Sequence, residues 1–77
     1  MGKRIELKMF RVRLDISQAE MAERIGVDRS TYSSVENGTR NGTYKFWMKF
    51  KTTFDIPESE MWRFMQVANE TDVSNNI

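Results

Sequence analysis

Apolar residues recur along the chain at the three- and four-residue spacing of helices, and they do not alternate with polar residues over any stretch that suggests a strand. Short polar or glycine-containing connections separate five helical segments, at about residues 2–13, 18–25, 29–37, 44–53 and 58–68. The sequence therefore predicts an all-α, compact five-helix domain over residues 1–68. The polar tail that follows, residues 69–77, is expected to be disordered.

Residues that cap helices mark several of the boundaries. Ser17 is followed three residues later by Glu20, which is the capping-box arrangement at a helix start. Gly26 suits the left-handed conformation that ends a helix in a tight turn. Asp28 and Thr43 are candidate N-caps of the third and fourth helices. Two short helices joined by a glycine turn are thus expected near the middle of the chain.

Each helix should contribute one apolar stripe to the core. The expected core residues are Leu7, Phe10, Leu14, Met21, Ala22, Ile25, Tyr32, Val35, Tyr44, Trp47, Met48 and Phe54. Two further groups exceed what a small core needs: Ile5, Met9 and Val12 in the first helix, and Trp62, Phe64, Met65 and Val67 in the last. These groups are either additional core or a surface that binds another protein.

The composition excludes most catalytic and metal-binding chemistry. A chain of 77 residues fits one domain, and it contains no cysteine and no histidine. No carboxylate pair has an evident catalytic arrangement. We therefore expect no enzyme, no catalytic residue, no metal or other cofactor, and no small-molecule substrate. The longest apolar run, Phe46-Trp47-Met48, is far too short for a membrane span, so a soluble cytoplasmic protein is expected.

The charge is distributed unevenly although the net charge is only +1. Residues 1–13 carry a net +4 and residues 28–51 a net +3, whereas residues 14–27 carry −2 and residues 52–77 carry −4. This separation allows a basic face of the kind that binds nucleic acid. Ordinary solvated charge is the alternative.

The most informative segment is residues 18–37, in which Ala22 follows Gln18 by four residues and Gly26 follows Ala22 by four. Val35 lies nine residues beyond this glycine. Two helices that cross steeply need a small residue where their backbones approach and a turn residue that accepts positive φ. The second helix could then present its outer face to the major groove of DNA.

The run from Ser17 to Gly38, SQAEMAERIGVDRSTYSSVENG, resembles the Cro/repressor helix-turn-helix family of phage and bacterial regulators. The resemblance covers about residues 7–61 and continues through Arg40-Asn41 and residues 54–57. It implies a lambda-repressor-like fold and a small transcriptional regulator, of a phage or mobile-element genetic switch, that binds operator DNA with helix 29–37 in the major groove. Members that read two half-sites do so as homodimers. Gly42 departs from the family pattern, which often has proline there.

The resemblance also assigns roles to individual residues. The implied DNA-binding face consists of Gln18, Arg29, Ser30, Thr31, Ser34, Asn37, Arg40 and Thr43. Gln18 matches a phosphate contact that also braces the third helix, while Arg29, Ser30 and Ser34 match base-reading positions. Gln18 and Thr43 could instead be helix-start residues, and the serines could be solvated surface. Arg11 and Glu36 match a pair that forms an ion pair between the first and third helices in some members.

A second function fits the same fold. Some small phage regulators are antirepressors, which bind a partner repressor and alter its DNA binding. Such a protein would use the face around Arg29, or an exposed apolar surface made of Ile5, Met9, Val12, Trp62 and Met65. The low net charge and the serine-rich third helix favour this alternative. An antitoxin would also fit the fold, but no additional toxin-wrapping segment is evident.

Overall fold

The computed structural model describes residues 2–68, and within them the chain is entirely helical, without a strand. The elements are α1 (Ile5–Arg13), α2 (Gln18–Ile25), α3 (Arg29–Glu36), α4 (Tyr44–Phe54), the short 3₁₀ helix η1 (Glu58–Glu60) and α5 (Met61–Met65). The prediction of an all-α five-helix domain is confirmed. The tail predicted at residues 69–77 lies outside the described residues.

The capping residues act as their positions suggest. Ser17 and Glu20 form both hydrogen bonds of a capping box. The side chains of Asp28 and Thr43 accept hydrogen bonds from the backbone N–H groups of Thr31 and Phe46. These bonds satisfy donors that a helix start leaves without an intrahelical partner. The second, third and fourth helices therefore begin where local sequence predicted.

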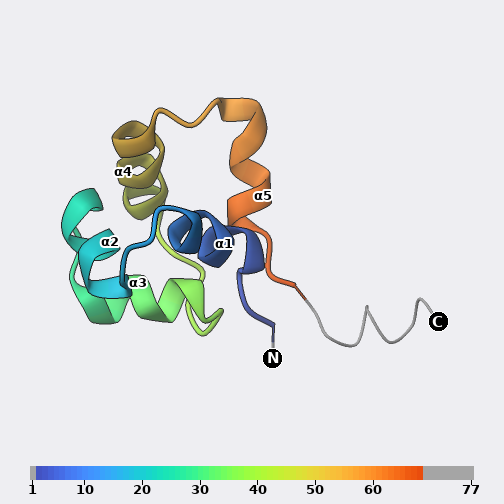
Figure 1. Ribbon diagram of the computed structural model, residues 1–77. Coiled ribbons are helices and arrows are strands. Elements are labelled where there is room, and N and C mark those ends of the chain that lie inside the picture. Colours follow the sequence, from blue (N-terminus) through green and yellow to red (C-terminus); the bar gives the residue numbers. More distant parts are fainter. Residues whose placement is uncertain (1, 69–77) are drawn as a thin grey trace.

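Aromatic rings from three helices form the centre of the core. The Phe10 ring of α1 packs edge-on against Phe50 and Phe54 of α4 and Phe64 of α5, with ring centroids 5.1 to 5.6 Å apart. Figure 1 shows the corresponding arrangement, with α1 between the α2–α3 pair and α5. Leu7 of α1 is fully buried in the same core.

Three expected core residues prove to be exposed: Leu14, Tyr44 and Met48. In α4 the buried face is formed by Phe46, Trp47 and Phe50. Tyr44, the first residue of the helix, lies outside this face. Tyr44 consequently has 81 % of its surface exposed. The apolar pattern of this helix was ambiguous because its six apolar residues among eleven do not form a single narrow stripe, and packing selected one face.

The last helix is shorter than predicted. Residues 58–60 form a 3₁₀ turn, and α5 ends at Met65 because the backbone becomes extended at Gln66. Phe64 is buried, so it is part of the core and not of an excess surface, whereas Trp62, Met65 and Val67 are exposed.

Arg4 holds the two ends of the described chain against α3. Its side chain is buried, at 3 % exposure, and its guanidinium donates hydrogen bonds of 2.7 to 3.1 Å to four carbonyl oxygens. These carbonyls belong to Val35, Arg40, Asn41 and Met65. The guanidinium also lies over the Trp47 ring, 5.5 Å from its centroid. Since α1 starts directly after Arg4, this arrangement also explains why the helix begins three residues later than expected.

Candidate nucleic-acid interface

The α2–α3 pair has the construction that the spacing of alanine and glycine indicated. Ala22 and Ile25 are buried, and Gly26 adopts φ +81° at the turn between the helices. The inner side of α3 is anchored by Tyr32 and Val35, which are fully buried. The outer side of α3 consists of hydroxyl, amide and arginine side chains. One helix is thus fixed to the core by one face and presents a polar face outward.

A buried carboxylate fixes the end of α3. Glu36 accepts hydrogen bonds from Arg11 Nε at 2.8 Å, Arg11 Nη2 at 3.1 Å, Gln18 Nε2 at 2.9 Å and the Tyr32 hydroxyl at 2.7 Å. Its side chain is only 3 % exposed. Four donors from three helices therefore surround one buried negative charge, which is what makes its burial tolerable.

The titration of this group reflects that environment. Burial raises the pKa of the Glu36 carboxyl, but hydrogen bonds from Arg11, Tyr32 and Gln18 outweigh burial, so its pKa lies below the ordinary value. Burial and the neighbouring carboxylate raise the pKa of the Tyr32 hydroxyl. Glu36 is therefore ionised, and Tyr32 is its neutral donor, at neutral pH.

Asp28 organises the first turn of α3. One carboxylate oxygen accepts the Ser30 hydroxyl at 2.6 Å and the Thr31 N–H at 3.1 Å, and the other accepts the Thr31 hydroxyl at 2.9 Å. Hydrogen bonds from Ser30 and Thr31 lower the pKa of Asp28 to about 2. Arg29 is exposed beside this cluster and forms no ion pair within residues 2–68.

The remaining implied DNA-binding residues follow along α3 and the loop after it. Ser34 and Asn37 lie one and two turns beyond Ser30 on the same helix face. The Asn37 amide donates to the Ser33 hydroxyl at 3.3 Å. Arg40 has an exposed side chain, while its backbone carbonyl is held by Arg4. The loop backbone is thus anchored and its basic side chain reaches solvent.

The loop reaches α4 through Gly42 and Thr43. Gly42 has φ +80°, a conformation that proline cannot adopt, and a Cβ there would lie 2.8 Å from Trp47 Nε1. The Trp47 indole N–H in turn donates to the Asn41 carbonyl at 3.1 Å. The departure from the family's proline therefore accompanies a bulky tryptophan packed beneath the loop. Thr43 caps α4, as its alternative reading suggested.

Two basic residues of the N-terminal segment do not contribute to a surface charge. Arg4 is buried among carbonyls, and Arg11 is paired with Glu36. The basic character expected from residues 1–13 therefore overstates what this segment offers to a ligand. The role of Arg4 was missed in the sequence, where an arginine near the start of a helix gives no sign that it will bind carbonyls from distant segments.

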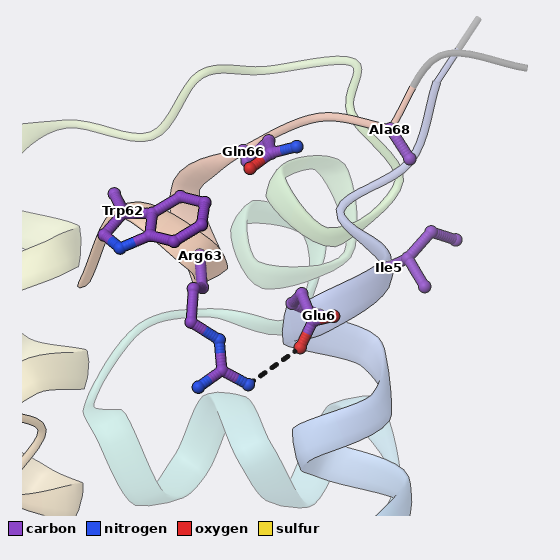
Figure 2. A pocket seen from close by; sticks show the side chains of 6 residues that line it. All are labelled: Ile5, Glu6, Trp62, Arg63, Gln66 and Ala68. Carbon is purple, nitrogen blue, oxygen red and sulfur yellow. Dashed lines mark hydrogen bonds and ion pairs between the residues drawn. The ribbon is translucent and has the colours of Figure 1, made fainter. Parts of the chain in front are cut away.

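The apolar residues proposed as a protein interface lie on α1 and α5. Ile5, Met9 and Val12 share one exposed face of α1, and Trp62 and Met65 are exposed on α5. Figure 2 shows Glu6 of α1 and Arg63 of α5, which are paired at 3.2 Å, and the Ile5 side chain pointing away from Trp62. Ile5 and Trp62 are both among the residues that line a hollow of about 320 Å³ there. The structure therefore brings Ile5 and Trp62 to one pocket.

Two other features are absent from residues 2–68. In that part of the chain no group of three or more acidic side chains is arranged to hold a metal ion. None of its helices has the length and apolar character needed to cross a membrane.

Comparison with known proteins gives concordant results. A family model described as helix-turn-helix matches residues 7–60. An "Uncharacterized HTH-type transcriptional regulator" of Archaeoglobus fulgidus is 33 % identical over 67 residues, which cover 77 % of this chain and 94 % of that protein. "Control protein C.MunI" of a Mycoplasma species is 36 % identical over 55 residues, which cover 71 % of this chain and 74 % of that protein. No solved structure matches the chain.

Proposed function

The chain belongs to the helix-turn-helix family of transcriptional regulators, and on this premise we propose that it binds operator DNA with α3 in the major groove. We place it in the cytoplasm, at a promoter of a phage or other mobile element. The observation that carries the proposal is the polarity of α3. Its inner face is anchored by Tyr32, Val35 and Glu36, while its outer face presents Arg29, Ser30, Ser34 and Asn37.

Rigid anchoring supports this role because reading base edges requires a helix held in one orientation. The Glu36 carboxylate joins α3 to α1 through Arg11 and to α2 through Gln18. Arg4 joins the end of α3 to the loop after it. In this proposal α3 and the loop approach DNA as one unit, and the exposed Arg40 contacts phosphate.

The surface charge around α3 is favourable. Residues 28–51 contain two acidic residues, of which Glu36 is buried and only Asp28 is exposed. The exposed cations in the same range include Arg29, Arg40 and Lys45. In this proposal Arg29 reads guanine through its O6 and N7 acceptors, since arginine pairs with both at once. One amide proton of Gln18 is donated to Glu36. The second amide proton and the side-chain carbonyl oxygen stay available, and in this proposal the amide donates to a phosphate of the DNA backbone.

A homodimer completes the proposal. Trp62 has 62 % of its surface exposed, and Ile5, Met9, Val12 and Met65 are exposed as well. These five residues of α1 and α5 are called the α1–α5 surface, and in this proposal they form the interface. Exposed apolar surface of this kind marks a protein interface more often than an isolated exposed residue does. Two copies joined there would present two reading helices to two half-sites.

Fluorescence anisotropy tests this function. The purified protein is titrated onto labelled DNA from beside its own gene and onto unrelated DNA, at several salt concentrations. Selective binding that weakens with salt would support the operator-binding function. Absence of selective binding at micromolar protein would reject it. A partner repressor would then become the ligand to test, as the antirepressor alternative requires.

A further inference from the structure

Asp28 is an unexpected residue on a face proposed to approach DNA. It is the exposed carboxylate of an otherwise basic stretch, and its low pKa keeps it charged at neutral pH. Capping does not by itself require a charge, because serine, threonine and asparagine also cap helices, and a negative charge at the helix N-terminus adds a favourable interaction with the helix dipole. The hydrogen bonds that Asp28 makes with side chains suggest a second role.

The direction of these hydrogen bonds follows from chemistry. An ionised carboxylate has no proton to donate, so Ser30 and Thr31 must each point their hydroxyl proton toward Asp28. The Ser30 contact is also short, at 2.6 Å, as hydrogen bonds to a charged acceptor are. Both hydroxyl oxygens are left with lone pairs alone. They can accept a hydrogen bond from DNA, but they cannot donate one while the carboxylate holds their protons.

This polarity matters in the major groove. There the amino groups of adenine (N6) and cytosine (N4) are donors, whereas guanine O6 and thymine O4 are acceptors. A serine that can rotate its hydroxyl freely discriminates poorly, because it can donate or accept. A serine whose proton is already engaged distinguishes an amino group from a carbonyl.

We propose that Asp28 is a specificity-determining positioning residue, which orients the Ser30 hydroxyl to select an amino-bearing base, adenine or cytosine, on one strand. This inference rests on the proposed DNA-binding function and deepens it. Ser30 would select for an amino group on the strand that it faces. A·T and C·G pairs with adenine or cytosine on that strand are therefore accepted, and the reversed pairs T·A and G·C are disfavoured. The adjacent Thr31 hydroxyl has the same polarity at the flank of the face.

Selection from a duplex library with randomised bases, followed by sequencing of the bound DNA, tests the proposal. Wild type is compared with Asp28→Gly, Asp28→Asn, Ser30→Ala and the control Asp55→Asn. Asp55 lies at the far end of α4 with φ +53°, a conformation that asparagine tolerates, so the control removes one negative charge away from α3. Asparagine caps a helix about as well as aspartate, and thermal unfolding verifies that each variant folds.

Wild type and Asp55→Asn should favour adenine or cytosine over guanine or thymine at one position by about fivefold, the worth of one ordinary hydrogen bond. Ser30→Ala should abolish that preference. Asp28→Gly, which removes both acceptor oxygens and is tolerated at an N-cap, should abolish it. Asp28→Asn should only weaken it, because the oxygen that accepts the Thr31 N–H also accepts the Ser30 hydroxyl, and an amide oxygen at that place is an uncharged and weaker acceptor. An amino preference that persists in Asp28→Gly would overturn the proposal and leave Asp28 as a cap only. If wild type enriches no sequence, the DNA-binding function itself fails.

Discussion

Arg11 of α1 and Glu36 at the end of α3 are joined by two hydrogen bonds, of 2.8 and 3.1 Å, and their side chains are 13 % and 3 % exposed. This contact is a buried ion pair and not a surface one, so each charge needs the other to offset the loss of its hydration. Removing one partner of a buried pair leaves an uncompensated charge, which is more destabilising than loss of an exposed pair. The orientation of α3, and hence of the proposed reading face, depends on this network.

The Tyr32 hydroxyl offers a way to weaken the network without breaking it. Tyr32→Phe removes one donor to Glu36 and should lower the free energy of unfolding at pH 7 by about 1.5–3 kcal/mol, the range for hydrogen bonds to charged groups. Because the pKa of Glu36 is lowered in the folded state, its contribution is present above the ordinary value of 4.5 and is lost as pH falls. The variant should therefore lose less stability between pH 7 and pH 3 than wild type.

Urea unfolding at the two pH values measures this difference. Tyr44→Phe is the matched control, since that hydroxyl is on an exposed side chain. Equal pH dependence in wild type and Tyr32→Phe would show that Tyr32 does not contribute to the lowered pKa.

Arg4 should matter for stability although no acidic residue pairs with it. Arg4→Met removes the donor of the Arg40 and Met65 carbonyl oxygens, and each one that stays buried and unpaired costs about 1–3 kcal/mol. The Val35 and Asn41 carbonyls keep a second donor, the Gly38 N–H and the Trp47 indole. We expect a loss of at least about 2 kcal/mol in the free energy of unfolding. Lys3→Met removes the neighbouring exposed cation and should change stability little. Similar unfolding midpoints for the two variants would contradict the role assigned to Arg4.

Arg29 is proposed to read a base. Arg29→Ala should cost about 1–3 kcal/mol of binding free energy at one base pair and relax the preference there. Binding to operators substituted one base pair at a time would locate the effect. An unchanged sequence preference in the variant would remove Arg29 from the base-reading residues.

Arg40 is proposed to contact phosphate, so its substitution should act differently. Arg40→Ala should weaken binding to operator and unrelated DNA alike and reduce the slope of log affinity against log salt by about one. Anisotropy titrations over a series of salt concentrations measure that slope. The same slope in variant and wild type would mean that Arg40 makes no phosphate contact.

The α1–α5 surface predicts the oligomeric state. Trp62→Glu places a charge on this apolar surface and should convert a dimer into a monomer, with weaker binding to a two-half-site operator. Analytical ultracentrifugation measures the state directly. Tyr44→Glu, at an exposed aromatic residue outside this surface, is the control and should remain dimeric. A wild-type protein that is monomeric at all concentrations would refute the dimer.

Local sequence by itself determined the helical class, the capped starts of α2, α3 and α4, and the small residue and glycine of the α2–α3 turn. These features depend on neighbouring residues, through hydrogen bonds to the first helical turn and through the φ angle that glycine permits. The polar outer face of α3 was also predictable from local sequence. Tyr32 and Val35 place the large apolar side chains on one side of the helix, which packs on the core, so the polar residues face outward.

Only the tertiary structure decided which residues of α4 are buried and what the N-terminal arginines do. Tyr44 and Phe46 are both aromatic, and only Phe46 is buried, where its ring stacks on Tyr32 of α3. Arg4 was one of five cations in residues 1–13, and its carbonyl partners lie 31 to 61 residues away in the sequence. Such contacts depend on where distant backbone segments meet, which the spacing of residues along one helix does not specify.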